Sequence, residues 1–358
     1  MGHLSCSGIK TFVTFASVVQ LSSYIYNPNC NLMRKIILSM LLLVVQMLCA
    51  QNDWLTRVGD VTPVAALSIP GTHNSATGNG LVCGLSIGVT QQLTIDEQWE
   101  LGVRAFDLRP DIKGENINIY HGAIKTRVTF AQVVETILEK LDSSPGEFAI
   151  VILRQERFAS DLCKRERWGN EMGQYIASLG DRAALFNPEL TVGEMRGKIL
   201  FLTRNQYSGC EKGAYISGWS HSEGGTYDAR IASYCGGCEA RLSVQDFYSP
   251  LTAEKQRAKL LSVVEHIERK AADRLLWSIN YLSGYSSVFL GIDGVPSKKG
   301  YMRNAAYVHK EFLEYIKGGD YGYGTGIIMM DYAGVELLKG FELLGKSVVE
   351  AIIESNFR

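Results

Sequence analysis

Short apolar runs recur along the chain, and polar stretches with helical periodicity separate several of them. Eight runs have the length and composition of buried strands: 64–73, 103–110, 116–122, 148–156, 198–204, 242–248, 275–283 and 325–333. Amphipathic stretches predict helices at 90–101, 129–141, 171–179, 253–272 and 305–316. Alternating strands and helices favour parallel βαβ units, and continuous apolar runs are typical of strands that are buried on both faces.

Eight such strands are most simply closed into a (β/α)₈ barrel, a fold of about 250 residues. The segment 205–241 interrupts the alternation, because it is rich in Gly and Ser and predicts no helix. The pattern therefore predicts a single α/β domain over residues 51–358, built as a distorted or incomplete (β/α)₈ TIM barrel.

The first fifty residues have a different pattern. Arg34 and Lys35 precede an apolar stretch at 36–48 that is short for a membrane span, and small or apolar residues follow at 48–50. This is typical of a signal peptide, with an N-terminal membrane anchor as the alternative. We expect residues 33–50 to be a signal peptide and residues 1–32 to be an artefact of start-codon choice. The protein would then be exported, and be secreted, periplasmic or held at the cell surface.

The formal net charge bears on possible partners, and the cysteines bear on possible disulfides. A net charge of −1 does not indicate the basic surface that binds nucleic acid. Five cysteines follow residue 50: Cys83, Cys163, Cys210, Cys235 and Cys238. The lone CxxC at 235–238 lacks a second pair for zinc, so a local disulfide, or one to Cys210, is favoured. The pairing stays open.

Most of the predicted strands change from apolar to polar or ionisable residues at their carboxyl ends. The residues in question are His73, Asn74, Asp107, Arg109, His121, Arg154, Arg204, Asp246, Tyr248 and Asp331. Taken singly, a histidine at the end of a strand is more often a structural hydrogen-bonding group, and an aspartate or arginine there is more often a cap or part of an ion pair. In a βα barrel, however, the carboxyl ends of all strands meet at one face. Packing alone gives no reason to bury so many charges there, so the joint pattern favours a functional site at this end of the barrel, which we call the mouth.

This set of side chains fits the cleavage of a phosphodiester. Two histidines can act as base and acid near neutral pH, and arginines bind phosphate in a bidentate manner. An aspartate can orient a histidine and stabilise its charged form. The sequence has no HExxH motif. An internal hydroxyl of the substrate is a suitable nucleophile for this set of side chains.

The ordered motifs SIPGTHNS (68–75), GVRAFDLR (102–109) and IYHG (119–122) are followed by ILFLTR, SVQDFY and MMDY. Over most of residues 52–358 the chain resembles the single-domain bacterial phosphatidylinositol-specific phospholipase C family. The resemblance implies a distorted barrel that cleaves phosphatidylinositol to diacylglycerol and inositol 1,2-cyclic phosphate. The resemblance also suggests glycosylphosphatidylinositol anchors as a second substrate, and the choice between the two stays open.

The resemblance also implies roles for individual residues. His73 would be the general base for the inositol 2-hydroxyl, and His121 the general acid for the leaving oxygen. Arg109 would hold the phosphate, and Asp331 would fix the tautomer of His73. The remaining matches are Asp107 near the phosphate, Arg154, Arg204 and Asp246 on the inositol hydroxyls, and Tyr248 stacked on the ring.

Two residues depart from the bacterial pattern. Asn74 stands where the bacterial type usually has Asp, and Asn is a metal ligand in the calcium-dependent eukaryotic type. That type needs an acidic residue where this chain has Arg109, a fixed cation that would repel calcium. We therefore expect no cofactor, with calcium as the alternative. Arg154 stands where the bacterial type usually has Lys, which keeps the charge but changes the geometry.

A lipid substrate needs an apolar rim around the mouth, and the loop 81–89 is unusually apolar. The predicted rim consists of Leu81, Val82, Leu85, Ile87, Trp219 and Tyr285, the alternative being that these residues pack on the barrel. We expect a monomer that acts on phosphatidylinositol-containing membranes. Two other functions stay open. One is a metal-dependent barrel phosphodiesterase acting on another lipid or a glycerophosphodiester, and the other is a catalytically dead barrel that binds headgroups.

Overall fold

The computed structural model describes Lys35 and residues 53–83, 88–156, 162–220, 225–250, 252–285, 288–289, 292–293 and 298–358. Residues 52–358 form one compact unit. The predicted signal peptide and the upstream segment lie, apart from Lys35, outside the described residues.

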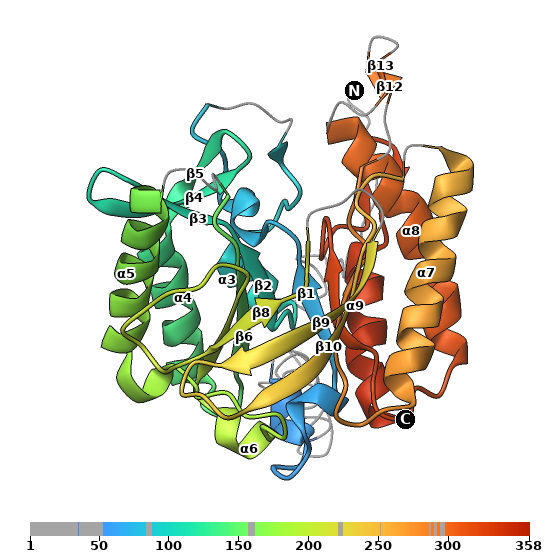
Figure 1. Ribbon diagram of the computed structural model, residues 1–358. Helices are drawn as coiled ribbons and strands as arrows, with labels where there is room; N and C mark the ends of the chain where they lie inside the picture. Colours follow the sequence, from blue (N-terminus) through green and yellow to red (C-terminus); the bar gives the residue numbers. More distant parts are fainter. Residues whose placement is uncertain are drawn as a thin grey trace, which may run out of the picture. The chain divides into compact units, whose positions relative to one another are not determined.

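Strands of the described chain close a barrel in the order β1–β14–β11–β10–β9–β8–β7–β6–β2 (Figure 1). These strands are β1 (Ser68–Thr72), β2 (Ala105–Leu108), β6 (Ala149–Leu153), β7 (Ile199–Thr203), β8 (Ala214–Ser217), β9 (Gly225–Ser233), β10 (Glu239–Asp246), β11 (Trp277–Tyr281) and β14 (Gly326–Met330). Only β9 among them runs antiparallel to its neighbours β8 and β10. The predicted distorted α/β barrel is therefore confirmed, and the segment 205–241 supplies strands β8 and β9 instead of a helix.

The third predicted strand is not part of the barrel, which corrects the expected strand order. It forms β4 (Asn116–His121) in a separate antiparallel sheet with β3 (Pro110–Lys113) and β5 (Ile124–Thr129). A parallel neighbour needs a crossover of about a dozen residues. Only the short segment 109–115 joins β2 to β4, so the chain can form a hairpin but no βαβ unit. In Figure 1 this small sheet lies above the end of β2.

Helices cover the outside of the barrel, with α4 and α5 on one side of Figure 1 and α7 and α8 on the other. The helices are α3 (Ile95–Glu100), α4 (Phe130–Ser143), α5 (Leu162–Ser178), α6 (Val192–Met195), α7 (Ala253–Ala271), α8 (Lys298–Gly318) and α9 (Gly345–Glu354). Short two-stranded sheets are formed by β12 (Val288–Phe289) with β13 (Ile292–Asp293) and by β15 (Leu337–Leu338) with β16 (Phe341–Glu342). Within the described residues, no helix has both the length and the apolar character needed to cross a membrane.

Helix α3 begins later than predicted, and the residues before it support the mouth. Thr94 caps the helix in a capping box with Glu97. Upstream of it, Thr90 Oγ1 and Gln91 Nε2 both donate hydrogen bonds to the carbonyl oxygen of His73. Residues 90–94 are therefore non-helical, and Thr90 and Gln91 fix the residue that follows β1.

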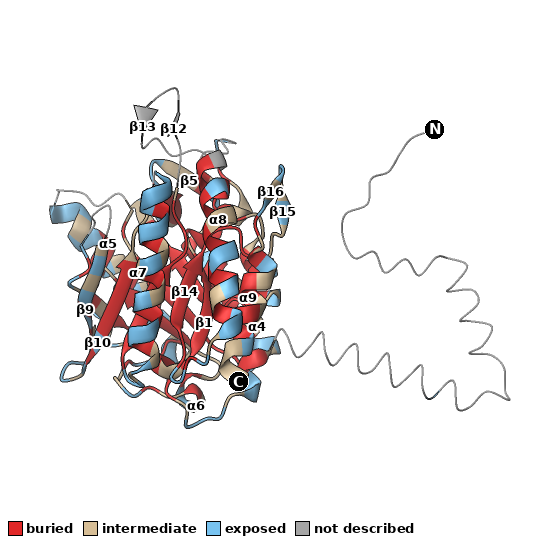
Figure 2. Cartoon of the chain, turned by 90° about the vertical axis from the view of Figure 1, so that its right-hand side faces the viewer, coloured by how far each residue is buried: buried red, intermediate tan, exposed pale blue. Residues whose placement is uncertain are grey.

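The core is mostly apolar, and its apolar residues form one large continuous cluster. Strands β6 and β7 are buried at every position, and each helix turns a buried face inward and an exposed face outward (Figure 2). One ion pair lies within this core. Arg104 Nε donates to Glu147 Oε2 at 2.8 Å, and both side chains are fully buried. Burial lowers the pKa of Arg104 and raises the pKa of Glu147 despite their mutual attraction, which shows that desolvation is a large opposing cost.

Glu147→Gln should lower the free energy of unfolding by about 3–5 kcal/mol, because it leaves the Arg104 guanidinium charged and buried without its counter-ion. The double variant Arg104→Met/Glu147→Leu should recover most of that loss, since it removes both charges and keeps apolar volume. Urea unfolding of the three proteins tests this. A double variant no more stable than the single one would contradict it.

Candidate active site

The parallel register between β1 and β14 brings His73 and Asp331 together. Thr72 pairs with Met330, so the next residue of each strand lies at the same level of the mouth. His73 Nδ1 donates to Asp331 Oδ1 at 2.8 Å, and Asp331 is fully buried. Its other oxygen accepts the backbone N–H of Gly284 at 3.3 Å. The carboxylate is therefore fixed from two sides and places the proton of His73 on Nδ1.

The second ring nitrogen of His73 then carries a lone pair. Two donors point at Nε2: the Asn74 amide at 2.9 Å and Arg109 Nη2 at 3.0 Å. The amide orientation follows from this network. Asn74 adopts the left-handed region at φ 46°, which Asn tolerates better than most residues. The geometry presents Nε2 of His73 at the cavity, where a general base is required.

Arg109 is the central cation of the site. It contacts Asp107 Oδ2 at 3.5 Å and Glu156 Oε2 at 3.2 Å. Burial alone would lower the pKa of Arg109, but the two carboxylates raise it above its usual value. Its Nε is buried and has no hydrogen-bond partner among the described residues. A permanently charged guanidinium with a donor to spare fits an oxyanion such as phosphate.

His121 approaches the same cavity from the small antiparallel sheet. Its ring centroid lies 6.1 Å from that of His73, and its Nδ1 donates to the carbonyl oxygen of Gly88 at 2.6 Å. Burial, and then the positive charge of Arg109, lower the pKa of His121 to about 4. These surroundings therefore favour the neutral imidazole at pH 7, in which Nδ1 carries the proton that is donated to Gly88.

Glu156 is a site residue that the sequence reasoning passed over. Its Oε1 accepts the backbone N–H of Gly122, next to His121, at 2.6 Å while the same carboxylate binds Arg109. Burial opposes its charge, but Arg109 and the Gly122 N–H lower the pKa of Glu156 to about 2. The sequence does point to Glu156, because it follows Arg154 by two positions and would lie on the same side of an extended chain.

The predicted residues converge on one cavity of about 250 Å³. Its wall includes His73, Asp107, Arg109, His121, Arg154, Glu156, Arg204, Asp246, Tyr248, Tyr281, Gly284, Tyr285 and Tyr301. Asn74 and Asp331 touch it through His73. Asp246 accepts the Trp219 Nε1–H at 3.1 Å, and the Arg204 guanidinium carbon lies 3.8 Å from the centre of the Trp219 ring.

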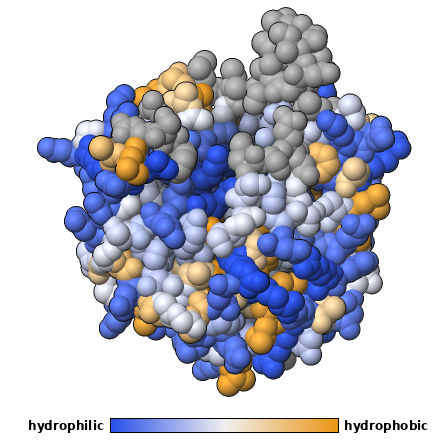
Figure 3. Space-filling model, in the orientation of Figure 1, coloured by the Kyte–Doolittle hydropathy of each residue, from blue (hydrophilic) through white to orange (hydrophobic). Residues whose placement is uncertain are grey.

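The predicted membrane rim needs correction at two positions. Leu81 is 3% exposed and forms a β-bridge with Thr126, so it packs inward. Trp219 is 8% exposed because it supports Arg204 and Asp246 from behind. Val82 is 59% exposed, as a rim residue should be, and Tyr285 lines the cavity. Leu85 and Ile87 lie outside the described residues. The face seen in Figure 3 is mostly hydrophilic, with apolar residues in small separate groups.

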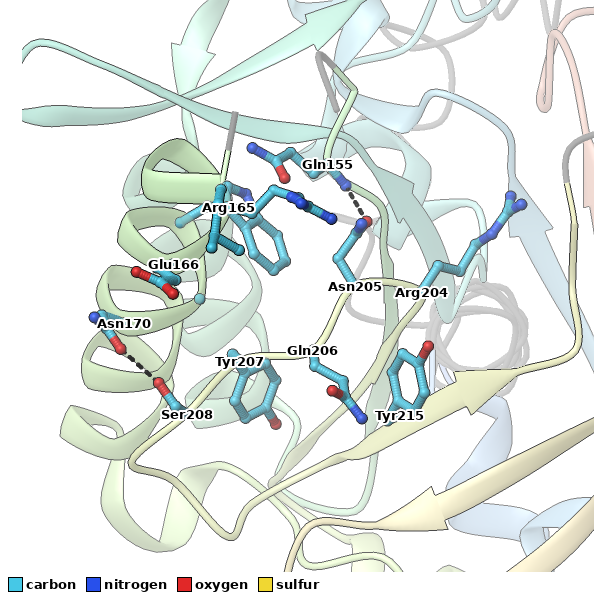
Figure 4. Close-up of a pocket in the computed structure, with 13 residues that line it drawn as sticks. Gln155, Arg165, Glu166, Asn170, Arg204, Asn205, Gln206, Tyr207, Ser208 and Tyr215 are labelled. Atoms are coloured by element: carbon cyan, nitrogen blue, oxygen red, sulfur yellow. Dashed lines mark hydrogen bonds between the residues drawn. The ribbon is translucent and has the colours of Figure 1, made fainter. Parts of the chain in front are cut away.

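A second cavity of about 600 Å³ lies beside the first, and Arg204 borders both. Figure 4 shows it between α5 and the chain that follows β7, with the Arg204 side chain pointing away from it. Most of its wall is made of uncharged amides and aromatic rings: Gln155, Trp168, Asn170, Asn205, Gln206, Tyr207 and Tyr215.

The predicted local disulfide is absent from the described structure. Cys210, Cys235 and Cys238 carry free thiols, and Cys235 Sγ lies 2.9 Å from Ser233 Oγ instead. Within the described residues, no cluster of three or more His, Cys, Asp or Glu side chains could hold a metal ion.

No family model matches the chain. A relative from Listeria monocytogenes named 1-phosphatidylinositol phosphodiesterase is 33% identical over 159 residues, which is 43% of this chain and 49% of that protein. The chain thus matches about half the length of this relative. A relative of the same name from Staphylococcus aureus (strain Newman) is 24% identical over 85% of this chain and 94% of its own.

Solved structures give the same picture. A double mutant of the phosphatidylinositol-specific phospholipase C from S. aureus superposes with a TM-score of 0.68 at 22% identity, covering 86% of this chain and 97% of the other. The enzyme from L. monocytogenes gives 0.61 at 22% identity, covering 86% and 98%. These structures share the barrel fold, and the resemblance to bacterial phosphatidylinositol-specific phospholipases C is confirmed.

The position of Arg109 predicts a measurable effect on His121. Arg109→Gln should raise the pKa of His121 by about one unit, because a buried positive charge that disfavours the imidazolium is lost. Nitrogen NMR of the imidazole across a pH titration measures it. Arg154→Gln makes the same change in a neighbour on the cavity wall and should shift the pKa less. Equal shifts in both variants would contradict this account.

Proposed function

We propose that this relative of the bacterial phosphatidylinositol-specific phospholipases C cleaves phosphatidylinositol to diacylglycerol and inositol 1,2-cyclic phosphate. One observation carries the proposal. The lone pair of His73 Nε2 faces a cavity in which Arg109 and a second histidine stand close by. A base, a phosphate-binding cation and an acid are the three groups that such a transfer requires.

The reaction begins when Arg109 Nη2 turns from His73 Nε2 to a phosphate oxygen, and Nε2 then accepts the proton of the inositol 2-hydroxyl. The resulting alkoxide forms a new bond to the adjacent phosphorus, and the bond from phosphorus to the diacylglycerol oxygen breaks. That oxygen takes a proton from His121 Nε2. Asp331 stabilises the imidazolium of His73. Arg109 donates hydrogen bonds to the phosphate oxygens, including one from its Nε, which has no other partner among the described residues.

His121 must be protonated before it can act as the acid. Its surroundings in the protein lower its pKa to about 4, and burial is the largest cause. A bound phosphate adds a negative charge beside the ring and favours the imidazolium. Glu156 acts in the same direction, since its carboxylate also raises the pKa of His121. Substrate binding therefore charges the acid.

We propose that the reaction needs no metal ion, and the place of Arg109 supports this. Its guanidinium already satisfies Asp107 and Glu156, the carboxylates that a calcium ion would need. Asn74 directs its amide nitrogen to His73 and supports the base. We extend the proposal to an exported monomer that works at phosphatidylinositol-containing membranes, with residues 33–50 as the signal peptide. Membrane binding and its modulation are the subject of a solved structure of the S. aureus phosphatidylinositol-specific phospholipase C.

Phosphorus NMR of residues 51–358 with phosphatidylinositol micelles and excess EDTA tests the reaction. A cyclic phosphate signal should appear, and His73→Ala should reduce its rate of formation about a thousandfold by removing the base. Activity that returns only with calcium would assign Asn74 to a metal site and overturn the metal-free reaction. No product under either condition would favour another diester or a headgroup-binding barrel.

A glycosylated inositol is a second candidate substrate, and the second cavity is the observation that favours it. The resemblance places Arg204 at inositol hydroxyls away from the reacting phosphate. A sugar attached at that edge of the ring would pass Arg204 and reach the amides and rings shown in Figure 4. Amides offer both donors and acceptors to hydroxyl groups, and aromatic faces pack on the apolar faces of sugars.

Gln206→Trp should discriminate between the two substrates. Gln206 is exposed on the wall of the second cavity, so a large ring there would fill the cavity without disturbing the core. Release of a glycosylphosphatidylinositol-anchored protein should fall about tenfold, while cleavage of phosphatidylinositol should not change. Glu211→Trp, exposed in the same loop and outside the cavity wall, is the matched control. An unchanged ratio of the two activities would rule out a glycan at this site.

A further inference from the structure

Lys259 is a buried amine that the proposed reaction does not use. It lies on the inner side of α7 with 0% of its surface exposed. Its Nζ donates to the carbonyl oxygens of Phe247 at 2.6 Å and Ser283 at 2.8 Å. These carbonyls belong to two separate loops, one after β10 and one after β11. We propose that Lys259 is a positioning residue that ties the two loops into one wall of the catalytic cavity.

Both loops carry groups of the active site. Phe247 precedes Tyr248, and Ser283 precedes Gly284, and both of these following residues line the cavity. The Gly284 N–H holds Asp331 Oδ2, so the loop after β11 also orients the partner of His73. A movement of either carbonyl would thus reach the ring-stacking tyrosine or the carboxylate that fixes the base.

The loops have one further bond to each other that Lys259 reinforces. The Tyr285 N–H donates to the Tyr248 carbonyl at 3.0 Å. Without Lys259, the carbonyl oxygens of Phe247 and Ser283 would lose this hydrogen-bond donor, and a buried carbonyl without a donor is costly. The Lys259 amine supplies that donor.

The charge of Lys259 is coupled to the site as well. Burial lowers the pKa of Lys259 to about 7, and the carboxylates of Asp246 and Asp331 partly offset that effect. Asp246 lines the cavity, and Asp331 binds His73. The Lys259 amine therefore interacts electrostatically with two carboxylates of the site, in addition to donating its two hydrogen bonds.

Lys270 on the same helix is a natural control. It is also buried, and its Nζ donates to two carbonyl oxygens, of Asp273 at 2.8 Å and Tyr323 at 2.7 Å. Those carbonyls precede β11 and β14, so they lie at the opposite end of the barrel from the mouth. The two lysines share one chemistry, and only Lys259 contacts the loops of the site.

The test compares Lys259→Met with Lys270→Met, using a soluble short-chain phosphatidylinositol so that membrane binding plays no part. Both variants should lose thermal stability. Only Lys259→Met should raise KM about tenfold, because the wall that holds the ring loosens, with a smaller loss in kcat. Only Lys259→Met should also shift the far-downfield proton NMR signal of the His73 Nδ1–H. Lys259→Gln, which keeps N–H donors on a shorter side chain, should restore part of both effects.

Equal KM values and an unshifted His73 signal in Lys259→Met would reduce Lys259 to a structural residue and overturn the proposal. If that variant does not fold, Lys259→Gln against Lys270→Gln gives the same comparison, with an expected rise in KM of about threefold. The kinetic measurement rests on the proposed function, but the NMR measurement does not. A chain that fails to cleave phosphatidylinositol would therefore still show whether Lys259 positions Asp331 and His73.

Discussion

The parallel register of the barrel strands is the constraint on which the site depends. It sets which residues leave adjacent strands at the same height. The pairing of Thr72 with Met330 places His73 against Asp331, and the pairings of β2, β6 and β7 bring Arg109, Arg154 and Arg204 into one row. A shift of one residue in any pair would turn a charged side chain from the mouth to the helical shell. The apolar interior that fixes the register thereby also fixes the chemistry.

A row of arginines at one mouth would be unstable without compensation. The structure places Glu156 and Asp107 against Arg109, and the mutual attraction of Glu156 and Arg109 acts on the pKa of both groups. Burial opposes both charges, yet the pKa of Glu156 falls to about 2 while that of Arg109 rises. The pair is therefore ionised at any pH at which the protein works. It acts as a fixed field into which an anion can bind with little reorganisation.

Much of this arrangement could be predicted from the sequence. Continuous apolar runs ending in His, Asp and Arg indicated the barrel and its mouth, and the predicted His73–Asp331 pair is present at 2.8 Å. Two features could not be predicted from such runs. A strand such as 116–121 reads alike in a barrel and in a side sheet, and only the length of the preceding connection separates them. The burial of Leu81 and Trp219 depends on tertiary contacts that an apolar loop sequence does not encode.

The two histidines are held differently because His73 follows a strand of the barrel and His121 belongs to the small antiparallel sheet. His73 follows a barrel strand, where register and a buried carboxylate fix its proton. His121 belongs to β4, which hydrogen-bonds to no barrel strand in the described structure, and it is held by the Gly88 carbonyl and by the link from Gly122 to Glu156. In the proposed reaction, identical side chains thus receive opposite roles from their surroundings: His73 would be the base, and His121 would become the acid once an anion binds. The barrel would then supply the base and the added sheet the acid, and Arg109 with Glu156 would be the contact through which the two parts act on one phosphate.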